Sequence, residues 1–134
     1  MSKHPYLRAY LAGIAVPTML MLVVIIVFVV VRFVYNVPIA IERLLVFPMA
    51  VVPILWGLWN MFYVRLETRR LPLGVHGAAL VLLLAPVGFT LARALEIGIV
   101  TPGLAFTVAP VGLIAYYLLW KHIVGFLNQL LGVA

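Results

Sequence analysis

Long stretches without a charged residue constrain the fold of this chain more than any other feature. Four such stretches, each of 21 to 24 residues, cover positions 9–31, 44–64, 71–92 and 97–120. A helix needs about 20 predominantly apolar residues to cross a bilayer, and it satisfies its own backbone groups where lipid offers no hydrogen bonds. The sequence therefore predicts four transmembrane helices, at about 9–33, 44–65, 75–95 and 103–124.

Composition supports an all-α membrane protein over the other classes. Of the 134 residues, 67% are hydrophobic and 9% are charged, whereas a soluble domain has about 25% charged residues. A membrane β-barrel alternates polar and apolar residues along each strand, but the segment from Met19 to Val31 is apolar without alternation. We therefore expect residues 1–134 to form one helical transmembrane domain.

The connections between the four expected helices are short, which favours antiparallel neighbours and an up-down-up-down bundle. The first apolar stretch exceeds the 7–15 residues of a signal peptide, so it is interpreted as a retained helix. With the N-terminus inside, Arg32, Arg43 and Arg93 lie outside, and a larger basic set lies inside: Lys3, Arg8, Arg65, Arg69, Arg70 and Lys121. This asymmetry predicts cytoplasmic termini, and a bacterial inner membrane is the expected location.

Small residues predict where helices pack closely in lipid. The third expected helix contains Ala85, Gly88 and Ala92. The fourth contains Ala105, Ala109 and Gly112. We expect these two helices to pack tightly through these positions. The same surface is compatible with dimerisation or with ordinary contact inside one bundle.

One polar position stands out within the second expected helix. Trp56, Asn60, Tyr63 and Glu67 follow a helical spacing of 4, 3 and 4 residues, so they share one side of the helix. One interpretation is a ligand groove for a quinone or a lipid head group, with Asn60 holding a polar group against Trp56 and Tyr63. The alternative is an interhelical hydrogen bond at Asn60 and an aromatic belt.

Charged residues near the expected outer end form a second candidate site. Arg93 and Glu96 are three residues apart, which places them on one face of a helix. The first interpretation is a local ion pair at the membrane interface. The second is a charged mouth at which Arg32 and Arg43 converge.

The sequence offers few groups for cofactor or acid–base chemistry. It has no Cys, and its carboxylates are Glu42, Glu67 and Glu96. His76 and His122 are expected at similar depth, where two histidines could ligate a haem axially; interfacial side chains are the other interpretation. We predict no metal site, no cofactor and no catalytic cluster, and no nucleic-acid partner, since the positive charge lies at helix ends.

The sequence therefore favours a non-catalytic membrane protein in contact with the lipid bilayer, which acts as a homo-oligomer or as a subunit of a larger membrane complex. An oligomeric channel or transporter is the first alternative. This alternative is supported by the prolines within the expected helices, because transporters build binding sites from interrupted helices. These prolines are Pro53, Pro86 and Pro110. A protein that binds a lipid, a quinone or a haem is the second. The sequence leaves open whether residues 125–134 continue the last helix or lie on the membrane surface.

Overall fold

The computed structural model describes residues 3–66, 71–98 and 101–133, and this part of the chain is helical apart from short connections and ends. It contains four helical segments long and apolar enough to cross a membrane by length and composition. They are Pro5–Val34, Ile41–Arg65, Leu73–Ala94 and Pro102–Leu130. The expected all-helical class and the four candidate spans are confirmed.

Two of the four segments are made of several elements. The second contains α2 (Ile41–Leu44), η1 (Leu45–Ala50) and α3 (Val51–Arg65). The fourth contains α5 (Pro102–Leu118), η2 (Leu119–Val124) and α6 (Gly125–Leu130). The other two are α1 (Pro5–Val34) and α4 (Leu73–Ala94). Within η1, Phe47 has an extended backbone (φ −139°, ψ 128°), which bends this segment away from a straight helix.

The fourth segment runs beyond its expected end near residue 124 and includes most of the C-terminal tail. Its first turn starts at Pro102, and Thr101 Oγ1 accepts a hydrogen bond from the Leu104 backbone N–H at 3.2 Å, as an N-cap does. Its last turn closes through Gly132, which has φ 65°. The N–H of Val133 donates to the Asn128 carbonyl at 2.8 Å, the pattern of a glycine C-cap.

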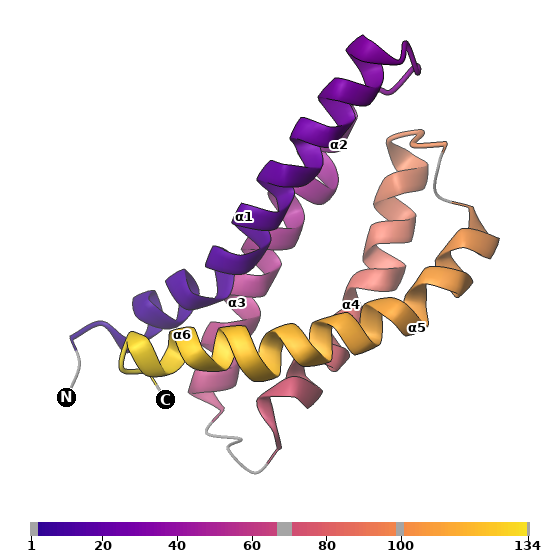
Figure 1. Ribbon diagram of the computed structural model, residues 1–134. Helices are drawn as coiled ribbons and strands as arrows, with labels where there is room; N and C mark the ends of the chain where they lie inside the picture. The colour runs from indigo at the N-terminus through magenta and orange to yellow at the C-terminus, as the bar shows by residue number, and fades with distance from the viewer. Residues whose placement is uncertain (1–2, 67–70, 99–100, 134) are drawn as a thin grey trace.

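The helices form two pairs that meet near the chain ends (Figure 1). α1 and α3 lie side by side, α4 packs against α5, and the segment α5–η2–α6 runs obliquely until α6 reaches the first turns of α1. The N- and C-termini lie at the same end of the molecule. There, Arg8 Nη1 donates to the Leu131 carbonyl at 3.3 Å and links α1 to the end of α6.

Glycine allows the close approach of α1 and α3. A Cβ on Gly13 would lie 2.6 Å from the Trp56 carbonyl oxygen and 2.9 Å from the Gly57 Cα. On the same side of α1, Ala9 and Ala12 are fully buried. Small residues let helix backbones approach closely in lipid, so the Ala9–Gly13 spacing of four residues brings α1 against α3.

A second close contact holds α4 against the fourth segment. A Cβ on Gly77 would lie 2.6 Å from both the Trp120 Cβ and the Tyr116 carbonyl oxygen. The apolar core next to this contact draws on α3, α4 and η2 and consists of Val52, Trp56, Leu80, Leu84, Trp120 and Val124. The core therefore lies where the two helix pairs meet.

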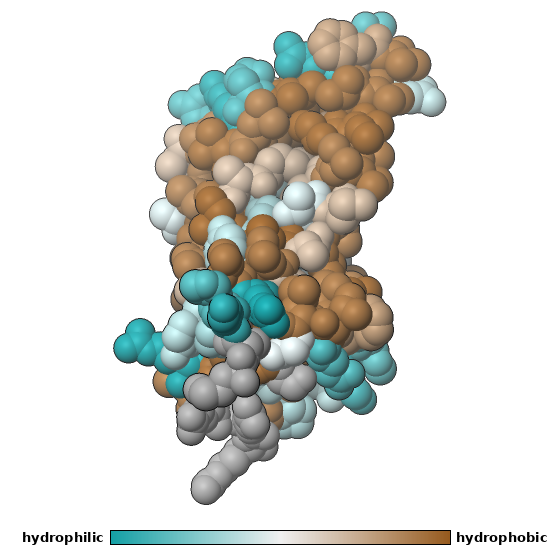
Figure 2. Space-filling model, turned by 90° about the vertical axis from the view of Figure 1, so that its left-hand side faces the viewer, coloured by the Kyte–Doolittle hydropathy of each residue, from teal (hydrophilic) through white to brown (hydrophobic). Residues whose placement is uncertain are grey.

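Much of the remaining surface is apolar. In Figure 2, hydrophobic side chains form a broad band across the middle of the molecule, with hydrophilic residues toward the top and the lower part. Exposed members of this surface on α1 include Met19 (66%), Val23 (60%) and Ile26 (55%). Apolar side chains at this exposure fit a lipid surrounding, since about 30 Å of bilayer hydrocarbon must be matched by apolar surface.

Candidate functional site

A buried pair of amides joins three helices near the end of the molecule where the termini lie. Asn60 Nδ2 donates to Asn128 Oδ1 at 2.7 Å, and Asn128 Nδ2 donates back to Asn60 Oδ1 at 3.1 Å. Asn60 Nδ2 also donates to the Ala9 carbonyl at 2.7 Å. Both asparagines are fully buried. The network therefore connects α1, α3 and α6 through neutral groups only.

Aromatic rings from α3 and the fourth segment pack beside this network. The Trp56 ring meets the Tyr116 ring edge-on, with centroids 4.8 Å apart, and lies 5.4 Å from the Trp120 ring. The indole N–H groups of Trp56 and Trp120 are buried without a hydrogen-bond partner among the described residues. In contrast, Trp59 Nε1 donates to the His76 carbonyl at 3.0 Å, which joins α3 to α4.

The structure places the expected ligand stripe against neighbouring helices. Trp56 and Asn60 are buried, and Tyr63 lies edge-on to His76 with ring centroids 4.8 Å apart. The Asn60 amide is engaged by Asn128 and Ala9, so a ligand at this position has to compete with three internal hydrogen bonds. Ligand binding here stays a prediction. Glu67, the fourth member of the stripe, lies outside the described residues, as do Arg69 and Arg70.

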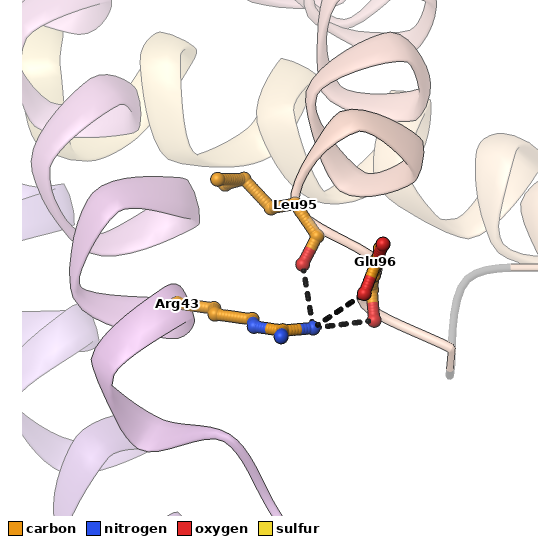
Figure 3. A network of polar contacts seen from close by, with 3 residues as sticks. All are labelled: Arg43, Leu95 and Glu96. Carbon is orange, nitrogen blue, oxygen red and sulfur yellow. Dashed lines mark hydrogen bonds and ion pairs between the residues drawn. The ribbon is translucent and has the colours of Figure 1, made fainter.

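Two ion pairs lie at the end of the molecule opposite the termini. Arg32 pairs with Glu42 at 3.6 Å, and Arg43 pairs with Glu96 at 3.4 Å. Figure 3 shows that Arg43 Nη1 also donates to the carbonyl oxygens of Leu95 (3.1 Å) and Glu96 (3.3 Å). A cation at these carbonyls is favourable because the C-terminus of a helix carries partial negative charge.

The sequence spacing of Arg93 and Glu96 does not bring their side chains together as a helical pair. α4 ends at Ala94, and Glu96 has a left-handed backbone with φ 54°. The N–H of Ile97 donates to the Ala92 carbonyl at 2.8 Å, which closes the helix end. This turn directs Glu96 to Arg43 across the two helices, while the Arg93 guanidinium lies 5.8 Å from the Phe89 ring centroid.

The small residues expected to pack α4 against α5 line an apolar groove of about 310 Å³ between these helices. Ala85 and Gly88 contribute from α4, and Ala105, Ala109 and Gly112 from α5. Ala92 is buried outside the groove lining. A Cβ on Gly112 would meet only Val81, at 3.8 Å. Gly112 therefore leaves space between the helices, whereas a Cβ on Gly88 would lie 2.7 Å from the Phe47 ring.

The two histidines occupy different environments. His76 is 8% exposed, and its Nε2 has no partner among the described residues, whereas His122 is exposed on η2. The described residues also contain no group of three or more His, Asp or Glu side chains placed to hold a metal ion. Axial ligation of a haem by both histidines stays a prediction.

Sequence reasoning missed two partners of this region. Asn128 lies within residues 125–134, whose conformation the sequence leaves open, and Gly57 is the single glycine of the second expected helix. The signal for Asn128 is a row with Trp120 and Val124 at four-residue spacing, and all three are fully buried. This row is the side of η2 and α6 that faces the other helices.

Comparisons of the chain with protein-family models, with curated proteins and with solved structures found no match.

Proposed function

We propose that this chain is a small multi-pass membrane protein that acts without catalysis, by associating with further copies of itself. The observation that carries the proposal is that none of the 17 residues of α5 (Pro102–Leu118) is buried. A membrane helix with so little internal packing has most of its surface free for a neighbour. Association as a subunit of a larger membrane complex would use the same surface.

The pattern on the exposed side of α5 supports a helix as the neighbour. Leu104, Thr107, Val111, Ile114 and Leu118 follow alternating spacings of three and four residues. Val111 and Ile114 are 65% and 63% exposed. Spacing of this kind forms the seam of helices that pack at shallow crossing angles, the geometry of many membrane bundles. We call these five residues the α5 seam.

The buried polar groups favour association over transport. Within the described part of the chain, the buried polar side chains are Asn60, His76 and Asn128. The two asparagines bind each other, so they do not line a polar path through the molecule. A channel formed between protomers would use other residues, and the α5 seam contributes only Thr107 as a polar side chain.

We further propose an up-down-up-down arrangement with both termini in the cytoplasm. The shared position of the termini in Figure 1 supports this arrangement. Lys3, Arg8 and Lys121 then lie on the cytoplasmic side, where basic residues accumulate in membrane proteins. A reporter fused to Ala134 is expected to be active only in the cytoplasm, and activity confined to the opposite side contradicts the proposed orientation.

The absence of Cys from the sequence makes disulfide cross-linking a sharp test of self-association. A disulfide requires Cα atoms about 4.4–6.8 Å apart, so Val111→Cys or Ile114→Cys should form a covalent dimer in the membrane under mild oxidation. Phe106→Cys is the matched control, because Phe106 is 81% exposed on the same helix and lies outside the seam. Cross-linking of Phe106→Cys at an equal rate, or of no α5 variant, contradicts association through this seam.

A further inference from the structure

The apolar groove between α4 and α5 is distinct from the α5 seam. Its lining includes Phe47, Phe89, Ala109 and Tyr116. On α5, the groove residues lie at positions 105, 108, 109, 112 and 116, whereas the seam residues recur at 104, 107, 111, 114 and 118. With 100° between successive helical residues, the two sets face different directions. A helix that binds to the seam therefore leaves the groove free.

The size of the groove fits a thin occupant. Its volume is about 310 Å³, and small residues on both helices line it, so a single apolar chain can lie between them. Along α4, the lining extends from Val81 to Phe89, about 12 Å at 1.5 Å per residue. One leaflet of the hydrocarbon core is about 15 Å deep, so the groove matches the depth of a single acyl chain.

A positive charge lies at one end of the groove. Ala85, Phe89 and Arg93 follow each other at four-residue spacing on α4, so they form one row along the helix. Ala85 and Phe89 line the groove, and the Arg93 guanidinium lies 5.8 Å from the Phe89 ring centroid. Arg93 is therefore the next residue along the groove wall, toward the end of α4.

The neighbouring carboxylates form ion pairs with other arginines. Among the described residues, Glu42 pairs with Arg32 and Glu96 pairs with Arg43. Arg93 is exposed and pairs with neither of them. An apolar groove that ends at an exposed guanidinium without a carboxylate partner in the described structure is complementary to a molecule with an apolar chain and an anionic head.

We propose that the groove binds an anionic phospholipid of the surrounding bilayer, with one acyl chain between α4 and α5 and the phosphate of the head group at Arg93. The acyl chain contacts the small residues of both helices, and it fills the space that these residues leave. Arg93 hydrogen-bonds the phosphate oxygens, for which a guanidinium is well suited. The bound lipid thereby completes the packing between α4 and α5.

Native mass spectrometry of the detergent-purified full chain tests this site. The delipidated protein is mixed with phosphatidylglycerol or with phosphatidylcholine of the same acyl chains. The wild type should retain phosphatidylglycerol about fivefold better than phosphatidylcholine, which corresponds to about 1 kcal/mol. Arg93→Gln should remove this preference and keep binding at the phosphatidylcholine level. Ala109→Leu, which fills the groove, should lower the retention of both lipids.

Arg32→Gln is the matched control. It removes the same charge at the same end of the molecule, and Arg32 also lies beside an aromatic ring, 5.5 Å from the Phe33 centroid. Arg32→Gln should leave the lipid preference unchanged. An equal loss in both arginine variants would mean attraction by net charge alone and would overturn the site. Unchanged retention in Ala109→Leu, with wild-type helix content by circular dichroism, would overturn the placement of the acyl chain.

Discussion

Asn60 and Asn128 exchange two hydrogen bonds, at 2.7 and 3.1 Å, although 68 positions separate them in the sequence. The pair couples the middle of α3 to the C-terminal element α6, and the Asn60 donor also reaches the Ala9 carbonyl in α1. Three of the four helical segments thus meet at one buried amide pair. The pair fixes the rotation and the axial position of these helices, because displacement of either amide leaves buried polar groups without partners.

Asn60→Leu and Asn128→Leu are each expected to lower the free energy of unfolding by about 1–2 kcal/mol, because each leaves the partner amide unsatisfied. The double variant should lose less than the sum of the single losses. Unfolding in detergent with increasing dodecyl sulfate, followed by circular dichroism, measures this coupling. Strictly additive losses would contradict a direct interaction between the two amides.

Gly13 and Gly112 should respond differently to alanine. At Gly13, the new Cβ would lie 2.6 Å from the Trp56 carbonyl oxygen, so α1 and α3 must separate. We expect Gly13→Ala to lower the free energy of unfolding by about 1–3 kcal/mol. At Gly112, the nearest atom is 3.8 Å away, and alanine favours helix, so Gly112→Ala should be neutral or stabilising by up to about 1 kcal/mol. Equal effects in the same unfolding assay would contradict the described packing.

Glu96 combines an unfavourable backbone with a favourable ion pair. Its φ of 54° costs a side-chain-bearing residue about 1–2 kcal/mol relative to glycine. The pair with Arg43 contributes about 0–1 kcal/mol, because the Glu96 side chain is 81% exposed. Glu96→Gly should therefore retain or raise the midpoint of thermal unfolding. Glu96→Ala keeps the strained backbone and loses the pair, so it should lower the midpoint. The reverse order would show that the ion pair outweighs the backbone strain.

His76 offers a test of the haem hypothesis and of the packing together. Its Nε2 is buried without a partner among the described residues, and its ring packs edge-on to Tyr63. His76→Phe keeps the aromatic contact and removes the unpaired polar atom, so the free energy of unfolding should rise by about 0.5–2 kcal/mol. If His76 is instead a haem ligand, the purified wild type has a Soret band and His76→Phe weakens it.

The charged residues show why local spacing predicts partners poorly. Arg93 and Glu96 are close in sequence, but the chain leaves the helix between them, and Glu96 turns to Arg43 in another segment. The small residues of α4 and α5 show the same limit. Their spacing predicts close packing of the two helices, but these positions line a groove, together with the bulkier Phe47 and Tyr116.

The sequence by itself determined that the chain is helical and has four segments able to cross a membrane. The physical reason is local: an apolar run of this length has to satisfy its backbone hydrogen bonds within itself, and charges are too costly to place inside it. The sequence also singled out Asn60, because it is a polar residue inside one of these uncharged runs. Only the tertiary structure decided that its partner is Asn128, because helix rotation and the continuation of the fourth helix to Leu130 depend on contacts between distant segments.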